Sequence, residues 1–462
     1  MWRKITIVST AVCCLAAAGA GTASAGSAGA GDPYFPQDGD GGYTVSRYDV
    51  GVSLDPATPE SFAGDTTVFA EAKQDLDRFD LDLEGFTVSS VLVNGSPAKA
   101  VARSGAHKLV ITPAQTVHKG SPLTVRVRYS GAPTGRSWHR LKGGGVNVTG
   151  EPHSATAWFP VNDHPSKKAA LHLEATVPSA WSVVGNGLPG PVTSRDGKTT
   201  YRWNEDRPIA SYATTMAVDK FTVRTSKLGD GTPVIHAYGQ NTSILPDSEN
   251  LVPDILGFLS SKFGPYPFSS AGSIVVAPER SDGSVALETQ TRPTYAGAFY
   301  DVSAVHELAH QWFGDSVSFS DWRDGCIAEC FAQYAGQLWD EHRDGADLDK
   351  NYRESVAEHK NDAAFWSVHL YDPGKEHPLD AALYDRGPLM LHALRRTVGD
   401  DIFFATLKAW QAKYRYGNAS WLDFEKLAAQ QSGKDLRGFF QAWAHSSVIP
   451  PDPYLHPGPL KA

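Results

Sequence analysis

The stretch of sequence that decides the fold is His306-Glu307-Leu308-Ala309-His310, which Glu329 follows after an interval of eighteen residues. Positions i and i+4 share one face of an α-helix, so His306 and His310 can present two imidazoles to one metal ion. Glu307 lies one position round the helix, where its carboxylate can reach a water molecule beside the ion. We therefore predict a catalytic zinc site with Glu307 as its general base.

Glu329 is the predicted third ligand of this ion. It stands near the start of the next expected helix, and the residues around it from 327 to 332 are mostly apolar. A carboxylate on the inner face of a helix needs a partner, because burying an unpaired charge is costly. A zinc ion held by His306, His310 and Glu329 provides that partner and keeps one position open. The alternatives are an exposed helix that happens to carry two histidines, and a Glu329 that begins its helix or faces solvent.

Strand patterns precede this motif, and helical patterns surround it. From about residue 46, short runs of alternating apolar and polar residues are separated by turns such as Asn94-Gly95, which indicates antiparallel strands. We therefore predict an N-terminal all-β sandwich or saddle domain over 43–225, followed by a mainly helical catalytic domain with a small sheet over 226–450. The expected helices cover 251–263, 303–313, 326–342, 351–358, 388–397, 403–414 and 424–431, with strands at 274–277 and 284–291.

Residues 1–25 have the pattern of a secretory signal peptide. Two basic residues, Arg3 and Lys4, precede an apolar stretch, and Ala23 and Ala25 give the small-x-small pattern of a cleavage site. The apolar stretch is too short to span a membrane comfortably, so we expect a secreted, extracellular protein with no membrane span after signal removal. The Gly-, Ala- and Asp-rich residues 26–42 predict a flexible lead-in, and residues 451–462 form a Pro-rich tail.

Cys326 and Cys330 are the cysteines that remain once residues 1–25 are removed. Export would allow them to oxidise. Their spacing of four residues on an expected helix disfavours a strain-free disulfide, so we predict two buried free thiols.

The composition excludes several other classes of protein. The 462 residues include 42 Lys and Arg against 51 Asp and Glu, and this acidic balance argues against a nucleic-acid partner. Hydrophobic residues make up 41% and charged residues 20%, which is ordinary for a folded globular chain. No apolar run of about 20 residues follows the N-terminal segment, so a polytopic membrane protein is excluded.

The motif and its spacing resemble the zinc signature of the gluzincin aminopeptidases, the family of aminopeptidase N. The run from Trp158 to Lys168 resembles the family's P-x-x-D-x-P-x-x-K stretch, and Tyr384-Asp385-Arg386-Gly387 resembles its Y-x-K/R-G segment. The resemblance covers about residues 43–450. It implies a thermolysin-like catalytic domain, one Zn²⁺ per chain, and peptide substrates with a free N-terminus. The chain ends soon after this domain, so the resemblance is to a short form that lacks the family's C-terminal helical domain.

The resemblance also suggests roles for residues outside the motif. Tyr384 matches the family's catalytic tyrosine, which donates to the developing oxyanion, although its sequence context alone would make it a core residue. Glu288 matches the glutamate of the family's GAMEN motif, which binds the substrate's α-ammonium; here the segment reads Val285-Ala286-Leu287-Glu288-Thr289. Glu151 is expected to assist from the N-terminal domain, with an ordinary loop carboxylate as the alternative. Asp324 is a further expected partner, for the imidazole of a zinc ligand.

Two other functions stay open at this point. A thermolysin-like endopeptidase would share the HExxH motif and the distal glutamate, but it would need neither Glu288 nor a β domain that reaches the site. A non-enzymatic binding module on the same fold would usually have lost a ligand or the base, whereas all four residues are present here.

Overall fold

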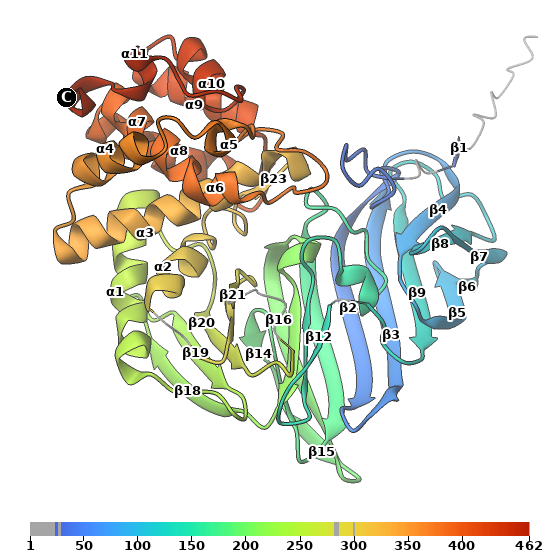
Figure 1. Cartoon of the computed structure of the whole chain (residues 1–462). Helices are drawn as coiled ribbons and strands as arrows, with labels where there is room; N and C mark the ends of the chain where they lie inside the picture. The colour runs from blue at the N-terminus through green and yellow to red at the C-terminus, as the bar shows by residue number, and fades with distance from the viewer. Residues whose placement is uncertain (1–23, 26–28, 136, 281–285, 299–300, 462) are drawn as a thin grey trace, which may run out of the picture.

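The computed structural model describes residues 24–25, 29–135, 137–280, 286–298 and 301–461. Strands fill the chain as far as Tyr238, and helices dominate from Pro246 onward. The helical part lies against one end of the β-rich part (Figure 1). This architecture confirms the predicted fold class. The predicted signal peptide falls on residues 1–25, of which 1–23 lie outside the described residues.

A nine-stranded sheet forms the body of the N-terminal domain. Along β2 the side chains of Tyr48, Val50 and Val52 are buried while their neighbours are partly exposed, as expected for strands with one face on a core. The strands of this sheet are β2 (Tyr43–Asp55), β3 (Thr58–Ala72), β5 (Thr87–Val93), β6 (Ser96–Pro97), β9 (Pro122–Ser130), β12 (Ala169–Pro178), β14 (Leu188–Pro189), β15 (Thr193–Arg195) and β16 (Lys198–Ile209).

Two four-stranded sheets complete this domain. One has the order β1-β4-β8-β7, and the other has the order β10-β11-β17-β13. The second sheet matters for the site, because β11 ends at Thr149, two residues before Glu151. The strands are β1 (Ser24–Ala25), β4 (Leu76–Asp82), β7 (Ala100–Ser104), β8 (Lys108–Thr112), β10 (Trp138–Arg140), β11 (Val146–Thr149), β13 (Ser182–Gly185) and β17 (Thr215–Asp219).

The sheet of the catalytic domain has the order β18-β19-β20-β22-β21. The last strand of the N-terminal sheets, β17, ends at Asp219, and the first strand of this sheet, β18, begins at Thr222. The predicted domain boundary at residue 225 falls inside β18. The strand expected over 284–291 is shorter in the structure, where β21 covers Ala286–Leu287, and residues 284–285 lie outside the described part. The strands are β18 (Thr222–Lys227), β19 (Pro233–Tyr238), β20 (Ala271–Val276), β21 (Ala286–Leu287) and β22 (Thr294–Ala296); β23 (Ser318–Phe319) pairs separately with β24 (Asn418–Ala419).

The seven predicted helices occur in the predicted order, with two differences at the metal motif, and four further short helices among the described residues, α5, α6, α10 and α11, were not predicted. The first helix of the motif, α2, ends at Ala309 rather than at 313, and the second, α3, begins at Glu329 after a 3₁₀ turn over Trp322–Ile327. None of the described helices is both long enough and apolar enough to cross a membrane. The helices are α1 (Pro246–Phe263), α2 (Asp301–Ala309), α3 (Glu329–Asp344), α4 (Leu348–Glu358), α5 (Ala363–Trp366), α6 (Ala381–Asp385), α7 (Gly387–Val398), α8 (Asp400–Tyr414), α9 (Trp421–Ser432), α10 (Arg437–Trp443) and α11 (Asp452–Leu455).

The turn after α2 is held by the N-terminal domain. The Lys168 ammonium donates to the carbonyl oxygens of Asp315 at 2.6 Å and Ser316 at 3.0 Å, and the Tyr212 hydroxyl donates to that of Gly314 at 2.8 Å. Gly314 has a φ of +115°, which side chains other than glycine rarely adopt. The turn that follows α2 is therefore fixed by contacts between the two domains.

The prediction of a flexible lead-in is wrong for residues 29–42. The acidic side chains of this segment, Asp32, Asp38 and Asp40, are buried. Asp32 accepts the backbone N–H of Trp322 at 3.0 Å, and Asp38 pairs with the imidazole of His153 at 3.0 Å. Composition suggested flexibility because the partners of these carboxylates lie far along the chain, where sequence does not reveal them.

The prediction of free thiols is also wrong, because Cys326 and Cys330 form a disulfide. The two residues do not share one regular α-helix: Cys326 lies in the 3₁₀ turn and Cys330 in the first turn of α3. This junction brings their Cα atoms to 4.8 Å, within the range that a disulfide needs.

Candidate active site

The ends of α2 and α3 bring three metal-ligating atoms together. The Nε2 atoms of His306 and His310 lie 3.0 Å apart, and the Glu329 carboxylate lies 3.4 Å from the first and 3.5 Å from the second. His310 and Glu329 are almost fully buried. Burial opposes ionisation of Glu329, but the imidazoles of His310 and His306 hold the pKa of its carboxyl well below the usual range. Glu329 is therefore an anionic ligand.

The outer nitrogens of both imidazoles are oriented by hydrogen bonds. His306 Nδ1 lies 3.0 Å from Gln333 Oε1, and His310 Nδ1 lies 3.0 Å from the carbonyl oxygen of Phe313. Both partners are acceptors, so each ring donates from Nδ1 and directs the lone pair of Nε2 inward. Two imidazole nitrogens and one carboxylate that face a common point are a donor set that fits zinc.

The expected role of Asp324 is wrong, and Gln333 takes its place. Asp324 accepts the backbone N–H of Trp421 at 2.8 Å and closes the capping box of its own 3₁₀ turn. Sequence reasoning missed Gln333, although its position four residues after Glu329 puts the two on the same face of α3.

Glu307 faces the same cavity from α2 and is 7% exposed. Burial raises the pKa of its carboxyl to about 7, although the imidazoles of His306 and His310 act in the opposite direction. A carboxyl group with a pKa in this range can both accept and return a proton at neutral pH.

Tyr384 reaches the cavity from α6, and its ring stacks over that of His306 with centroids 6.0 Å apart. Burial, together with the carboxylates of Glu329 and Glu151, raises the pKa of the Tyr384 phenol well above its usual value. The hydroxyl therefore stays protonated and can donate. Gly387, two residues after α6, allows the chain to pack closely against α3, because a Cβ at this position would lie only 2.4 Å from the sulfur of Cys330.

Two further carboxylates lie beside the three ligands. Oxygen atoms of Glu151, Glu288 and Glu329 all fall within 4.8 Å of one another. Glu288 follows β21 and is buried, and burial raises the pKa of its carboxyl. Burial and the charge of Glu288 raise the pKa of the half-buried Glu151 well above its usual range. Carboxylates this close repel one another, so the cluster favours a cation such as an ammonium group.

The seven residues predicted to bind metal or substrate or to act in catalysis line one cavity of about 630 Å³, and Asp324 is not among its lining residues. Its wall includes a polar stripe on α3 at helical spacing, made of Gln333, Gly336, Gln337 and Asp340, which sequence reasoning did not single out. A Cβ on Gly336 would meet no atom within 4 Å, so this face of α3 is open. Four of the cavity's five acidic lining residues, Glu151, Glu288, Glu307 and Glu329, lie at the ligand end, and the fifth, Asp340, lies further along α3.

Comparison with known proteins places this geometry among known peptidases. The chain matches the N-terminal domain of peptidase family M1 over residues 44–213 and the M1 peptidase domain over residues 286–443. It is similar to the crystal structure of an M1 zinc metallopeptidase from Deinococcus radiodurans bound to a Tyr-Ser-Ala substrate. That match has a TM-score of 0.83 and 30% identity, and it covers 92% of this chain and 99% of the other.

Curated relatives are more distant and longer. Aminopeptidase N of Streptomyces lividans is 26% identical over 322 residues, and the match covers 62% of this chain and 36% of that protein. Probable aminopeptidase 1 of Saccharolobus solfataricus is 23% identical over 312 residues, which is 63% of this chain and 40% of that protein. The chain thus spans less than half the length of these two relatives.

Proposed function

Because this chain belongs to peptidase family M1, and His306, His310 and Glu329 form a donor set that fits zinc, we propose that it is a zinc aminopeptidase that removes residues from the free N-terminus of peptides. The observation that carries the proposal is the cluster of Glu151 and Glu288 beside the three ligands. An endopeptidase has no use for carboxylates in this place, whereas an aminopeptidase needs them to locate the terminal ammonium.

Substrate recognition is the task of Glu288 and Glu151. Both carboxylates lie within 4.8 Å of the Glu329 carboxylate, so an ammonium held between them sits next to the metal ligands. The first peptide bond would then lie beside His306, His310 and Glu329, which would hold the zinc, and the bonds beyond it would not. Such positioning counts toward turnover as well as toward affinity.

When bound, zinc polarises the peptide carbonyl and lowers the pKa of a water molecule to about 7. Glu307 accepts the proton of the attacking water at its carboxylate and delivers it to the leaving nitrogen. Gln333 and the Phe313 carbonyl keep the two imidazoles in the tautomer that leaves Nε2 unprotonated.

Tyr384 acts on the carbonyl oxygen. Its protonated hydroxyl donates a hydrogen bond to that oxygen as negative charge develops, and this bond is stronger in the transition state than in the bound substrate. The stacking of its ring on His306 holds the hydroxyl at the ligand end of the cavity.

The experiment measures hydrolysis of a panel of aminoacyl-anilides by the purified protein, before and after treatment with a chelator and after zinc is returned. We expect the untreated protein to cleave the anilides, the chelator to abolish this activity, and added zinc to restore it. Elemental analysis should give one zinc per chain. Activity that the chelator does not affect would refute the zinc mechanism. Cleavage of internal bonds in N-terminally blocked peptides would instead favour an endopeptidase.

Export completes the proposal, on the support of the signal-peptide pattern of residues 1–25. N-terminal sequencing of protein recovered from the medium of an exporting bacterial host should give a chain that starts at Gly26. A product that stays in the cell with residues 1–25 intact would contradict export without touching the proposed activity.

A further inference from the structure

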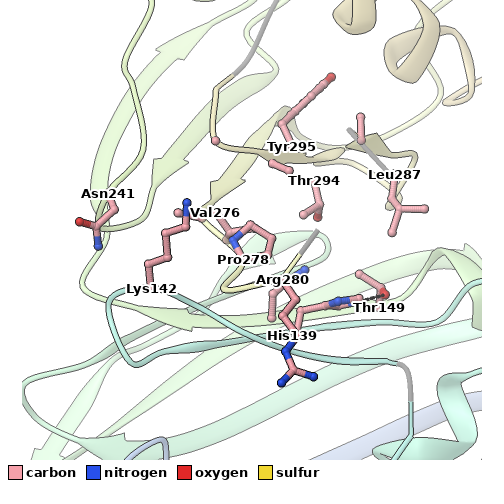
Figure 2. Close-up of a pocket in the computed structure, with 15 residues that line it drawn as sticks. His139, Lys142, Thr149, Asn241, Val276, Pro278, Arg280, Leu287, Thr294 and Tyr295 are labelled. Atoms are coloured by element: carbon pink, nitrogen blue, oxygen red, sulfur yellow. Dashed lines mark hydrogen bonds between the residues drawn. The ribbon is translucent and has the colours of Figure 1, made fainter. Parts of the chain in front are cut away.

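A second cavity, of about 280 Å³, shares lining residues with the catalytic one. Figure 2 shows this second cavity. It lies between the β10–β11 part of the N-terminal domain and the ends of β20 and β22 in the catalytic domain. Figure 2 shows Lys142 and Arg280 at this cavity, with Leu287 and Tyr295 across it. The proposed catalytic steps use none of these side chains.

The charge of this cavity is opposite to that of the catalytic one. Its charged or ionisable side chains are Lys142, Arg280 and His139, and none of its described lining residues is acidic. Lys142 and Arg280 are exposed at its rim, and neither forms an ion pair with a carboxylate in the described part of the chain. Two cations without a carboxylate partner among the described residues favour an anionic ligand.

The inner wall of the cavity is polar and incompletely satisfied. Asn147 is 3% exposed, and its side-chain oxygen has no hydrogen-bond partner among the residues that the structure describes. Beside it, the Thr149 hydroxyl lies 3.4 Å from His139 Nε2. The side-chain oxygen of Asn147 is an acceptor, so water or another donor completes it and a carboxylate does not. The positive charge at the rim, and not Asn147, is therefore what favours an anion in this cavity.

The two cavities share Ala286 and Leu287, the two residues of β21. This strand is the last of its sheet, so its outer edge has no neighbouring strand among the described residues. The residue after it, Glu288, is one of the proposed ammonium ligands. A substrate anchored at Glu288 thus starts one residue away from a wall that both cavities share, and an extended peptide advances by about 3.3 Å per residue.

We infer that the basic cavity is a subsite for a carboxylate of the peptide substrate. The inference rests on the proposed aminopeptidase function, because it takes Glu288 and Glu151 as the place where the ammonium binds. A carboxylate can come from two parts of such a substrate: the C-terminus of a short peptide, or the side chain of an acidic first residue. In both cases the acidic cavity takes the positive end of the substrate and the basic cavity takes the negative group.

The experiment separates these sources by binding, with zinc-loaded Glu307→Gln protein that cannot turn the peptides over. Calorimetry compares Ala-Ser-Ala as the free acid with its C-terminal amide, and compares the amides of Glu-Ser-Ala and Gln-Ser-Ala. We expect a preference of about 5–30-fold for the carboxylate in one of these two pairs, as two partly exposed charge contacts allow. A preference in the first pair assigns the C-terminus, and one in the second pair assigns the first side chain.

A double variant, Lys142→Gln with Arg280→Gln, should bring the preferred ratio down to within about twofold of one. The matched control is Arg195→Gln with Lys198→Gln, which removes two exposed cations from the β15–β16 hairpin and should keep the ratio. Ratios near one in both wild-type pairs, or an unchanged ratio in the Lys142 and Arg280 variant, would overturn the inference. Failure of the wild-type enzyme to cleave any free-amine peptide is a separate result, which would refute the proposed function.

Discussion

The catalytic cavity and the basic cavity share two residues of β21 but carry opposite charge. Five acidic side chains line the first, and two cations, Lys142 and Arg280, with no described acid line the second. A peptide in solution has the same separation of charge, with an ammonium at one end and a carboxylate at the other. Under the proposed function, this difference would let the site select the termini of a substrate by charge, independently of the metal that supplies the chemistry.

The largest effect is expected at the general base. Glu307→Gln should lower kcat by about 10²–10⁴-fold while zinc stays bound, because the amide cannot accept a proton. Glu329→Ala should instead lose zinc, because it removes a ligand. Kinetics and elemental analysis on both variants check this, and the reverse pattern would show that base and ligand are wrongly assigned.

The next effect is expected at Tyr384. Tyr384→Phe should lower kcat by about 10²–10³-fold and change KM little, because the hydroxyl acts mainly when the oxyanion forms. Glu307→Gln is the reference for full loss of proton transfer. A Tyr384→Phe variant with wild-type kcat would reduce this residue to a packing role against His306.

The recognition residues should follow. Glu288→Gln should lower kcat/KM for free-amine peptides by about 10–100-fold and leave the zinc content unchanged, because it removes a partly dry partner of the ammonium. Glu151→Gln should act in the same direction. The loop that carries Glu151 is also held in place by His153, whose imidazole lies 3.0 Å from the carboxylate of Asp38. Equal kcat/KM in wild type and Glu288→Gln would remove this residue from substrate binding.

The smallest effect is expected from salt concentration, which should act on binding at the basic cavity more than on binding at the catalytic one. Raising the ionic strength from about 0.05 M to 0.5 M should reduce the carboxylate preference about two- to threefold, because Lys142 and Arg280 are exposed and screened. Discrimination at Glu288, which is buried, should change less. A preference that is insensitive to salt would place the carboxylate contact away from these two cations.

The two cavities also differ in how far sequence could predict them. His306 and His310 follow from helical spacing, and Glu329 follows from its place among apolar residues near the start of the next helix. The basic cavity has no such signature: Lys142, Asn147 and Arg280 come from separate segments and meet only in the folded chain.

The errors in the sequence predictions have the same origin. The disulfide between Cys326 and Cys330 depends on the 3₁₀ turn that precedes α3. The sequence pattern suggested one regular helix through both cysteines instead. Residues 29–42 are ordered because, among other contacts, Asp32 accepts a hydrogen bond from the backbone of Trp322, 290 residues away. Gln333 is different, since its spacing from Glu329 was visible and could have identified it as the partner of His306.

The most direct test of the central claim measures kcat/KM for one tripeptide with a free amine and for its N-acetylated form, with the zinc-loaded wild-type protein. Acetylation removes the positive charge that Glu288 and Glu151 are proposed to bind and leaves the scissile bond unchanged. The account predicts that the first peptide bond of the free peptide is cleaved and that the acetylated peptide reacts at least about 10²-fold more slowly. Equal cleavage of both peptides would contradict it, because the acidic cluster would then play no part in locating the substrate.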